Sequence, residues 1–246
     1  MKGLLLEVCV DDADGLAAAI DGGADRIELC SALAVGGLTP SAGLMTFAGP
    51  PPVPVYAMIR PRPGDFVFGR AELDIMRRDI DATREAGLAG VVLGTSLPDG
   101  RLDERMLRKL TGHAAGLGLT LHRAFDLVPD FAEAVSIAVD LGFERILTSG
   151  GAKSAPEAID TLAQLVELAA GRISIMPGSG IAIDSVDVLL PRLAVTEVHS
   201  SCSVHEPAKD SRLVEMGFAS ADRRRTDTAT VRAMKARLNA LQAPTA

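Results

Sequence analysis

Polar and charged residues follow the apolar, strand-like runs of this 246-residue chain at their downstream ends, and they do so repeatedly. Residues 4–6 lead into Glu7 and Cys9, and residues 119–121 lead into His122. Polarity that always falls on the same end of successive strands indicates that the strands share one direction. Many loops would then build a single polar mouth, which is where an α/β barrel places its chemistry.

The spacing of the strand-like runs predicts the fold class. Helical patterns separate most of these runs, so the chain reads as parallel βαβ units. Eight units in 246 residues favour an α/β fold of the (β/α)8 TIM-barrel type. An open doubly wound sheet is the alternative, but no glycine fingerprint follows the first strand. The strands are expected over 3–9, 25–30, 53–59, 89–93, 118–123, 144–148, 172–176 and 195–200, and the helices over 12–22, 70–86, 103–115, 130–141, 154–170 and 184–191.

Two segments break this rhythm. Residues 31–40 predict a long loop that leads to a short helix at 41–48, and the polar stretch 202–225 predicts a longer loop before a final helix at about 227–241. Long loops at the strand ends are often functional. No linker separates a second domain, so residues 1–246 are expected to form a single barrel.

Charge and cysteine content exclude several classes of protein. A net charge of −7 argues against a general nucleic-acid binder or a protein of anionic membranes. No apolar stretch reaches membrane-spanning length, and the N-terminus lacks the basic and small-residue signals of a secretory leader. Three cysteines do not form a disulfide framework, so a cytoplasmic location is expected.

Strand periodicity predicts which side chains point into the barrel. Residues two apart share one face of a strand, and the intervening positions are aliphatic and suit the helix layer. The alternative is that the charged residues at the mouth form buried ion pairs with a purely structural role. The cost of desolvating buried charges makes such pairs a poor source of stability. The interior face at the mouth gives the candidate catalytic residues Glu7, Glu28, Arg60, His122 and His199.

Glycine-rich loops follow the sixth and seventh strands, and a serine pair follows the eighth. Glycines let the backbone approach a ligand closely and point N–H groups at it, and barrels often bind phosphate after strands 7 and 8. Glycine turns can also simply end strands. The candidate anion-binding residues are Arg62, Gly151, Gly178, Ser179, Gly180, Ser200 and Ser201.

Cys9 and Cys30 end the first two strands, which should be neighbours, and Cys202 could approach the same edge. Thiolates favour soft metals such as Cu(I) or zinc, so Cys9 and Cys30 are candidate metal ligands. Buried cysteines also act as small apolar residues, and no C-x-x-C pair is present. No organic cofactor is indicated.

Several stretches resemble the CutC copper-homeostasis family, and the resemblance runs from residue 4 to about 218. The family's third glycine loop usually has three glycines, whereas this chain has Ser179, and a serine follows His199 where glycine is common. Both departures narrow the expected anion pocket. The stretches that carry the resemblance are 6–9, 22–33, 36–41, 58–66, 122–126, 145–151 and 175–178.

The resemblance implies a cytoplasmic barrel that forms a homodimer or higher homo-oligomer and handles copper. It also implies that Cys9 and Cys30, which match two cysteines of the human relative, hold Cu(I). A lyase, isomerase or aldolase on a small anionic, sugar-like or phosphorylated substrate is the alternative. Glu7 or Glu28 would then be the base and His122 or His199 the proton donor. An interaction scaffold is the third hypothesis.

Overall fold

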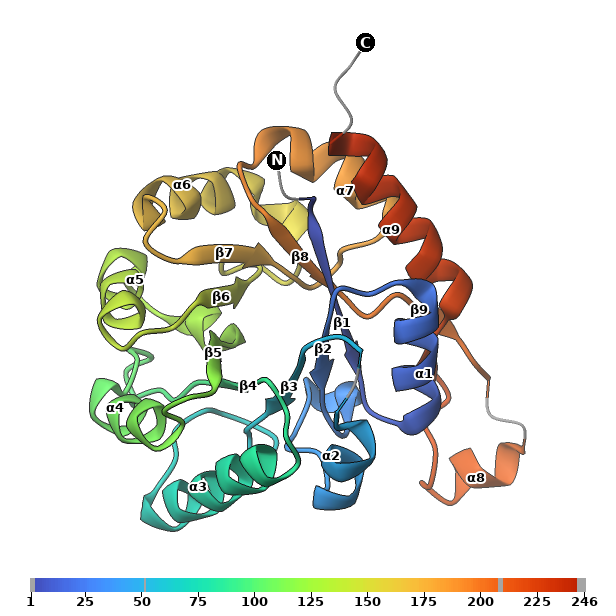
Figure 1. Cartoon of the computed structure of the whole chain (residues 1–246), viewed down its shortest axis with the longest axis horizontal. Helices are drawn as coiled ribbons and strands as arrows, with labels where there is room; N and C mark the ends of the chain where they lie inside the picture. Colours follow the sequence, from blue (N-terminus) through green and yellow to red (C-terminus); the bar gives the residue numbers. More distant parts are fainter. Residues whose placement is uncertain (1–2, 51, 208–209, 243–246) are drawn as a thin grey trace.

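The computed structural model describes residues 3–50, 52–207 and 210–242, and it forms a ring of eight parallel strands surrounded by helices (Figure 1). The ladder runs in the order β7-β6-β5-β4-β3-β2-β1-β8, and the two end strands lie beside each other. The predicted (β/α)8 barrel is therefore confirmed. The strands are β1 (Leu5–Val10), β2 (Arg26–Leu29), β3 (Val55–Met58), β4 (Gly90–Leu93), β5 (Gly118–Leu121), β6 (Arg145–Thr148), β7 (Ser174–Pro177) and β8 (Glu197–Ser200).

Each expected helix is present, and its ends are set by local caps. Asp12 and Asp103 accept the backbone N–H groups of Gly15 and Met106, and so begin their helices. Gly23, with φ 92°, ends α1 in the left-handed conformation that glycine favours. The helices are α1 (Ala13–Gly22), α2 (Ala42–Ala48), α3 (Arg70–Glu85), α4 (Glu104–His113), α5 (Phe131–Asp140), α6 (Ile159–Ala169), α7 (Ile183–Leu189), α8 (Ser211–Glu215) and α9 (Thr228–Gln242).

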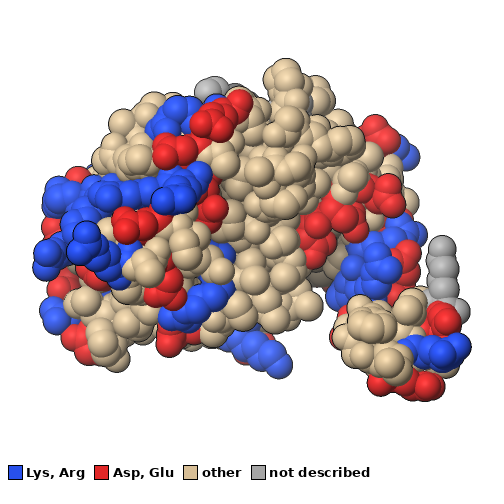
Figure 2. Space-filling view, turned by 90° about the horizontal axis from the view of Figure 1, so that it is seen from below, with Lys and Arg blue, Asp and Glu red and all other residues tan. Residues whose placement is uncertain are grey.

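The segment 202–225, expected as a loop, contains regular structure. Strands β9 (Ser203–His205) and β10 (Arg224–Thr226) pair antiparallel, and α8 lies between them. The part of this segment that carries α8 projects from the barrel at the lower right of the space-filling view (Figure 2). Local pairing between these two strands was not visible in the sequence, because each has only three residues and β10 has no apolar residue.

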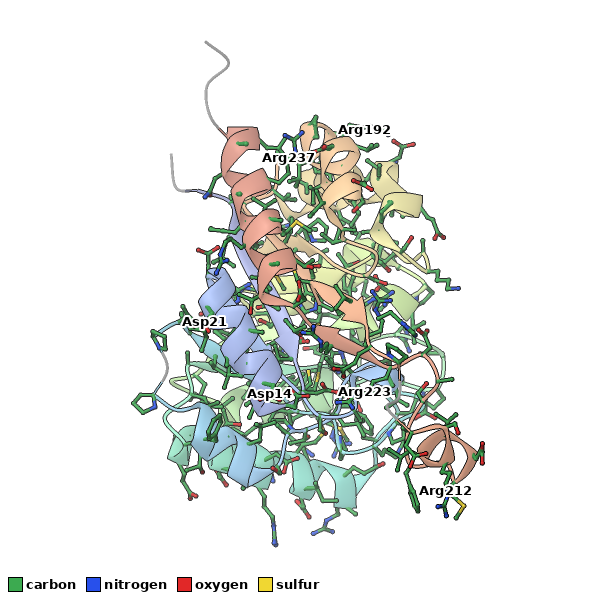
Figure 3. The ribbon with its side chains drawn as sticks, turned by 90° about the vertical axis from the view of Figure 1, so that its right-hand side faces the viewer. Asp14, Asp21, Arg192, Arg212, Arg223 and Arg237 are labelled. Atoms are coloured by element: carbon green, nitrogen blue, oxygen red, sulfur yellow. The ribbon has the colours of Figure 1, made fainter. Side chains whose placement is uncertain are left out.

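Helix α9 closes the outer wall of the barrel by packing along α1 (Figures 1 and 3). Val231, Met234 and Leu238 of α9 are buried. Arg237, labelled in Figure 3, donates to Asp187 of α7 at 2.5 Å, so α9 bridges α1 and α7. In the described part of the chain, no helix is long and apolar enough to span a membrane.

Alternate residues of the strands separate two apolar layers. Leu6, Ile27 and Ile59 belong to the large core between the strands and the helices. Inside the ring, a small cluster gathers Cys30, Tyr56, Met58 and Val92. The predicted alternation is thus confirmed for these strands, and the barrel interior above the small cluster is left to polar side chains.

The tight contact between α1 and α9 predicts a stability effect. A Cβ on Gly22 would lie 2.4 Å from Cβ of Val231 and 3.0 Å from the carbonyl oxygen of Thr228. Gly22→Ala should therefore lower the free energy of unfolding by about 1–3 kcal/mol through overpacking. Gly112→Ala is the matched control, because Gly112 lies in α4 with open space around it. That control should stabilise the protein by about 0.5–1 kcal/mol. Urea unfolding measures both, and equal effects would contradict the assigned packing.

Candidate metal and ligand site at the barrel mouth

A chain of buried charges crosses the barrel interior below the mouth. The guanidinium of Arg26 (β2) donates through Nε to Glu7 (β1) and through Nη2 to Glu197 (β8) at 2.6 Å. Arg145 (β6) lies 3.3 Å from the same Glu197 carboxylate. All four residues are at most 9% exposed. Glu7 is therefore part of a buried ion-pair network rather than a free group at the mouth.

Three members of this network, Arg26, Glu197 and Arg145, were not among the predicted site residues. Each stands at the start of its strand, whereas the predicted site residues lie at the downstream ends of strands. Arg26 lies two residues before Glu28, and Glu197 lies two residues before His199. The same face rule that selected the later residues could have found these earlier ones.

Glu7 connects the network to His199. Its Oε1 lies 2.8 Å from Nδ1 of His199. Burial alone would raise the pKa of Glu7, but Arg26 and His199 outweigh it and lower that pKa to about 2. An ionised carboxylate can only accept, so Nδ1 of His199 carries the shared proton. The other ring nitrogen, Nε2, consequently faces Glu28, whose Oε2 lies 3.8 Å away.

Cys9, Glu28 and His199 form a compact set of donor atoms. One ligand atom from each residue lies within 4.8 Å of the other two, and all three residues are buried. Burial opposes protonation of His199, but Cys9, Glu28 and Glu7 raise its pKa well above the ordinary value. Burial raises the pKa of Glu28, against the attraction of His199. The arrangement supplies one thiol, one imidazole and one carboxylate to a single point.

Cys30 lies outside this set. Its Sγ donates to Oε2 of Glu28 at 3.5 Å, and it is fully buried. Burial and the Glu28 charge raise the pKa of the Cys30 thiol well above its usual value. The structure therefore places Glu28 and His199 beside Cys9, and Cys30 contacts the same Glu28 oxygen, Oε2, that faces His199.

A pocket of about 250 Å³ opens above these donors. Three of the residues that line it each carry a buried polar atom without a hydrogen-bond partner in the described part of the chain: Oε1 of Glu28, Nε of Arg60 and Nε2 of His122. Buried polar atoms of native proteins are nearly always paired, so three orphans around one pocket point to a ligand or to bound water. The pocket is lined by Cys9, Glu28, Leu33, Gly36, Met58, Arg60, Phe66, His122, Arg123, Leu147, Ser179 and His199.

His122 is held as a neutral hydrogen-bond donor. Its Nδ1 accepts the backbone N–H of Ala124 at 3.1 Å, so the ring proton resides on Nε2, the atom without a partner. Burial and the nearby charge of Arg60 lower the pKa of His122 to about 3. The imidazole therefore stays uncharged at neutral pH.

Arg60 is mainly a clamp for the loops at the mouth. Nη1 donates to the carbonyl oxygens of Val35 and Gly37, and Nη2 donates to that of Gly64. The guanidinium also lies over the ring of Phe66, 4.7 Å from its centroid. Nε and the second N–H of Nη2 have no acceptor among the described residues, so three of the five guanidinium protons hold loops and two are left for a ligand.

The candidate anion-binding residues divide into two groups. Ser179, Gly180, Ser200 and Ser201 meet at a second hollow of about 670 Å³, which also reaches Cys9 and His199. Arg62 instead pairs with Asp65 and Glu72 and lines neither hollow. The N–H groups of Gly151 and Gly178 are used by Asp126 and by the Thr148 carbonyl.

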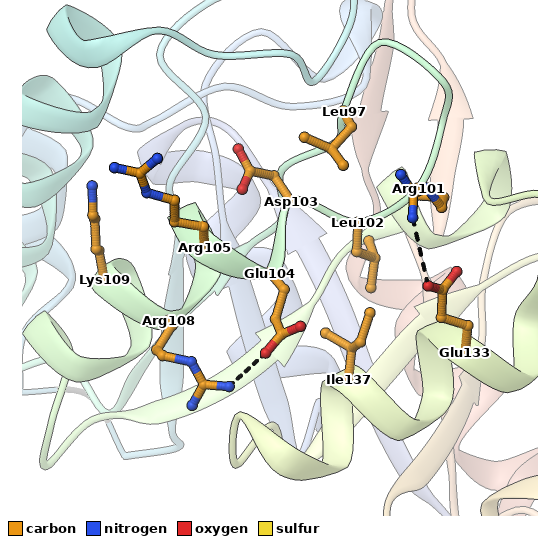
Figure 4. Close-up of a pocket in the computed structure, with 10 residues that line it drawn as sticks. All are labelled: Leu97, Arg101, Leu102, Asp103, Glu104, Arg105, Arg108, Lys109, Glu133 and Ile137. Atoms are coloured by element: carbon orange, nitrogen blue, oxygen red, sulfur yellow. Dashed lines mark hydrogen bonds and ion pairs between the residues drawn. The ribbon is translucent and has the colours of Figure 1, made fainter.

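A still larger hollow, of about 770 Å³, lies away from the mouth between α4 and α5 (Figure 4). Its charged side chains pair with each other, as Arg108 does with Glu104 at 2.6 Å and Arg101 with Glu133 at 3.9 Å. These pairs are solvent-exposed, and among the described residues none that lines this hollow has a buried polar atom in need of a partner. The mouth pocket is therefore the better candidate site.

Comparison with known proteins identifies the family. The CutC family model matches residues 4–204. The chain belongs to the CutC family. A family protein CutC of Rhizobium meliloti is 76% identical over 98% of both chains, and one of Agrobacterium fabrum is 56% identical over 96% of this chain and 95% of its own. The crystal structure of a CutC from Streptococcus agalactiae has a TM-score of 0.77 and 34% identity, and covers 80% of this chain and 98% of its own. All donors of the mouth lie inside the matched residues.

The buried neutral imidazole of this CutC protein predicts a pH effect. His122 binds a proton near pH 6.5 when unfolded but only near pH 3 when folded, so stability falls as pH drops between these values. Between pH 7 and pH 4.5, the wild type should lose about 2–3 kcal/mol more than His122→Asn, whose amide can still accept from Ala124. Urea unfolding at both values measures this. His205→Asn, at an exposed position, should behave like the wild type, and parallel losses in wild type and His122→Asn would contradict the assignment.

Proposed function

We propose that this CutC protein binds copper as Cu(I) at Cys9, Glu28 and His199 and serves copper homeostasis. The observation that carries the proposal is the convergence of three buried donor atoms within 4.8 Å at the barrel mouth. The Streptococcus agalactiae relative is described as a candidate copper homeostasis protein, which supports the choice of metal. In this proposal copper is the ion that the protein carries, and these three side chains are its ligands.

The chemistry of the donor set fits a soft or borderline ion. Thiolate ligands select Cu(I) and zinc, and imidazole suits copper and zinc. Glu7 fixes the ring of His199 through Nδ1, as outer carboxylates commonly do for metal-binding histidines, so that Nε2 faces Glu28 and can bind a metal ion on releasing its proton. The orphaned Oε1 of Glu28 provides a further unused lone pair.

The three cysteines support a reducing compartment, because all are buried and free. We therefore include a cytoplasmic location in the proposal. A homo-oligomer is likewise proposed, on the family resemblance of the sequence.

A Cu(I) competition titration against a chromophoric chelator tests the donor set. Cys9→Ser should weaken binding by at least about tenfold, because it removes the thiolate. His199→Asn should do the same, since its amide can keep the bond to Glu7 but lacks Nε2. Cys202→Ser is the matched control at another buried cysteine and should retain affinity.

Cys30→Ser separates the two possible donor sets, because serine can still donate to Glu28. We expect its Cu(I) affinity to stay within about threefold of the wild type. A loss as large as that of Cys9→Ser would replace our set by the Cys9–Cys30 pair. An equally weak Cu(I) affinity in the wild type and all variants would contradict the proposal of copper binding. Zn(II) in the same assay shows whether the site prefers copper.

The outer carboxylate yields a second prediction. Glu7→Gln should lower Cu(I) affinity by about 10–100-fold, because the charge that orients His199 is lost. It should also lower the free energy of unfolding by about 3–5 kcal/mol, because the buried charge of Arg26 loses a partner. Glu104→Gln, at an exposed ion pair, should change both by little. Chelator titration and urea unfolding measure the two effects. An unchanged Cu(I) affinity would contradict the role of Glu7 in orienting His199.

A second candidate function is an enzyme of the lyase, isomerase or aldolase class that acts on a small sugar-like substrate. The specific observation is the pair of orphaned N–H donors beside the mouth pocket, Nε of Arg60 and Nε2 of His122, which a metal ion does not explain. Glu28 would serve as base and the neutral His122 as proton donor, because the two differ in charge and face the same space. Turnover by sugar acids or sugar phosphates, lost in Glu28→Gln, is the test.

A further inference from the structure

The unpaired polar atoms of the residues around the mouth pocket include two hydrogen-bond donors and one acceptor. Nε2 of His122 and Nε of Arg60 are donors, and neither has a partner among the described residues. Oε1 of Glu28, in the same pocket, is an acceptor that also lacks one. Leaving a buried donor or acceptor unpaired is unfavourable, so a ligand that pairs all three gains from each.

The donor side can hold a single negative charge. His122 offers one proton on Nε2, and Arg60 offers the proton on Nε and the second proton of Nη2, because its other three N–H groups donate to loop carbonyls. Arg123 adds a guanidinium at the rim, where its Nε and Nη2 are bound to Asp126, Ser149 and Ala152. Donors from an imidazole and a guanidinium can pair the two oxygens of a carboxylate.

A phosphate dianion fits this pocket less well. The Glu28 carboxylate lines the pocket and would repel its second negative charge. A hydroxyl group, by contrast, can donate to Oε1 of Glu28.

The size and the apolar wall of the pocket limit the ligand further. A volume of about 250 Å³ equals roughly eight water molecules at liquid density. Leu33, Met58, Phe66 and Leu147 line the pocket and suit a short carbon chain. The ring of Phe66 lies against both His122 and Arg60, which holds the two donors in place.

We infer that the mouth pocket binds a small hydroxycarboxylate of about three to six carbons. Its carboxylate accepts from Nε of Arg60 and Nε2 of His122, and a hydroxyl donates to Oε1 of Glu28. This ligand class deepens the second proposed function and rests on it, and it does not depend on copper binding. It also differs from the phosphate site expected at the loops after β7 and β8.

Binding to the full-length protein, freed of metal with a chelator, tests the inference. The probes are D-glycerate, D-gluconate, glycerol and glycerol 3-phosphate, measured by saturation-transfer NMR and calorimetry. One or both acids should bind, and glycerol should bind at least about tenfold more weakly. Binding of glycerol 3-phosphate in preference to both acids would overturn the carboxylate assignment, and so would the absence of binding by either acid. This comparison uses the wild type alone, so it holds even where a variant folds poorly.

Two matched variants test whether the ligand binds at His122. His122→Asn keeps an acceptor for the Ala124 N–H but removes the donor into the pocket, so acid binding should fall at least about tenfold. His113→Asn, on α4 far along the outer surface, should bind as the wild type does. Undiminished binding in His122→Asn would overturn the assignment. Cu(I) affinity should be unchanged in His122→Asn, so a failed copper titration and a failed acid titration remain separate results.

Discussion

The buried contact of Glu7 with Arg26 on one side and His199 on the other organises the centre of this barrel. It ties together β1, β2 and β8, and it joins a purely internal ion-pair network to the polar mouth. Buried carboxylates are costly unless they are paired and hydrogen-bonded. Here two cationic partners hold Glu7 ionised, and Glu7 in turn sets which nitrogen of His199 faces the mouth. The orientation of His199 in the donor set thus follows from the ion pairs of Glu7, which lie deeper in the barrel than the mouth.

Much of the barrel could be read from the sequence, because strand–helix alternation and the parity of interior positions are local patterns. The pairing register could not. The resemblance directed attention to Cys9 and Cys30, whereas the ladder sets Cys9 opposite Glu28 and Glu7 opposite both Arg26 and His199. Neighbouring strands of a barrel are staggered, so residues at equal positions from two strand ends do not face each other. That stagger is a property of the closed ring and leaves no trace in either strand alone.

Two kinds of chemistry meet at the mouth. Cys9, Glu28 and His199 gather soft and borderline donors at one wall, and Arg60 and His122 present hydrogen-bond donors at another. Glu28 belongs to both, with one carboxylate oxygen toward Cys30 and His199 and the other without a partner among the described residues. Arg60 shows why residue type alone is a weak guide to role. Its position and charge placed it among the candidate catalytic residues, yet its side-chain hydrogen bonds hold loops, and the loop carbonyls that accept them cannot be recognised from sequence.

The ladder has one seam, between β7 and β8, where the strands are neighbours without a shared run of ladder pairing. The three donor residues lie on β1, β2 and β8, which are contiguous on the far side of that seam. Local opening of the seam would move β7 and its glycine loop while the distances among the donors stayed fixed by continuous ladders. The geometry of the donors is therefore set by continuous ladders and does not depend on the one place where the ring lacks ladder pairing.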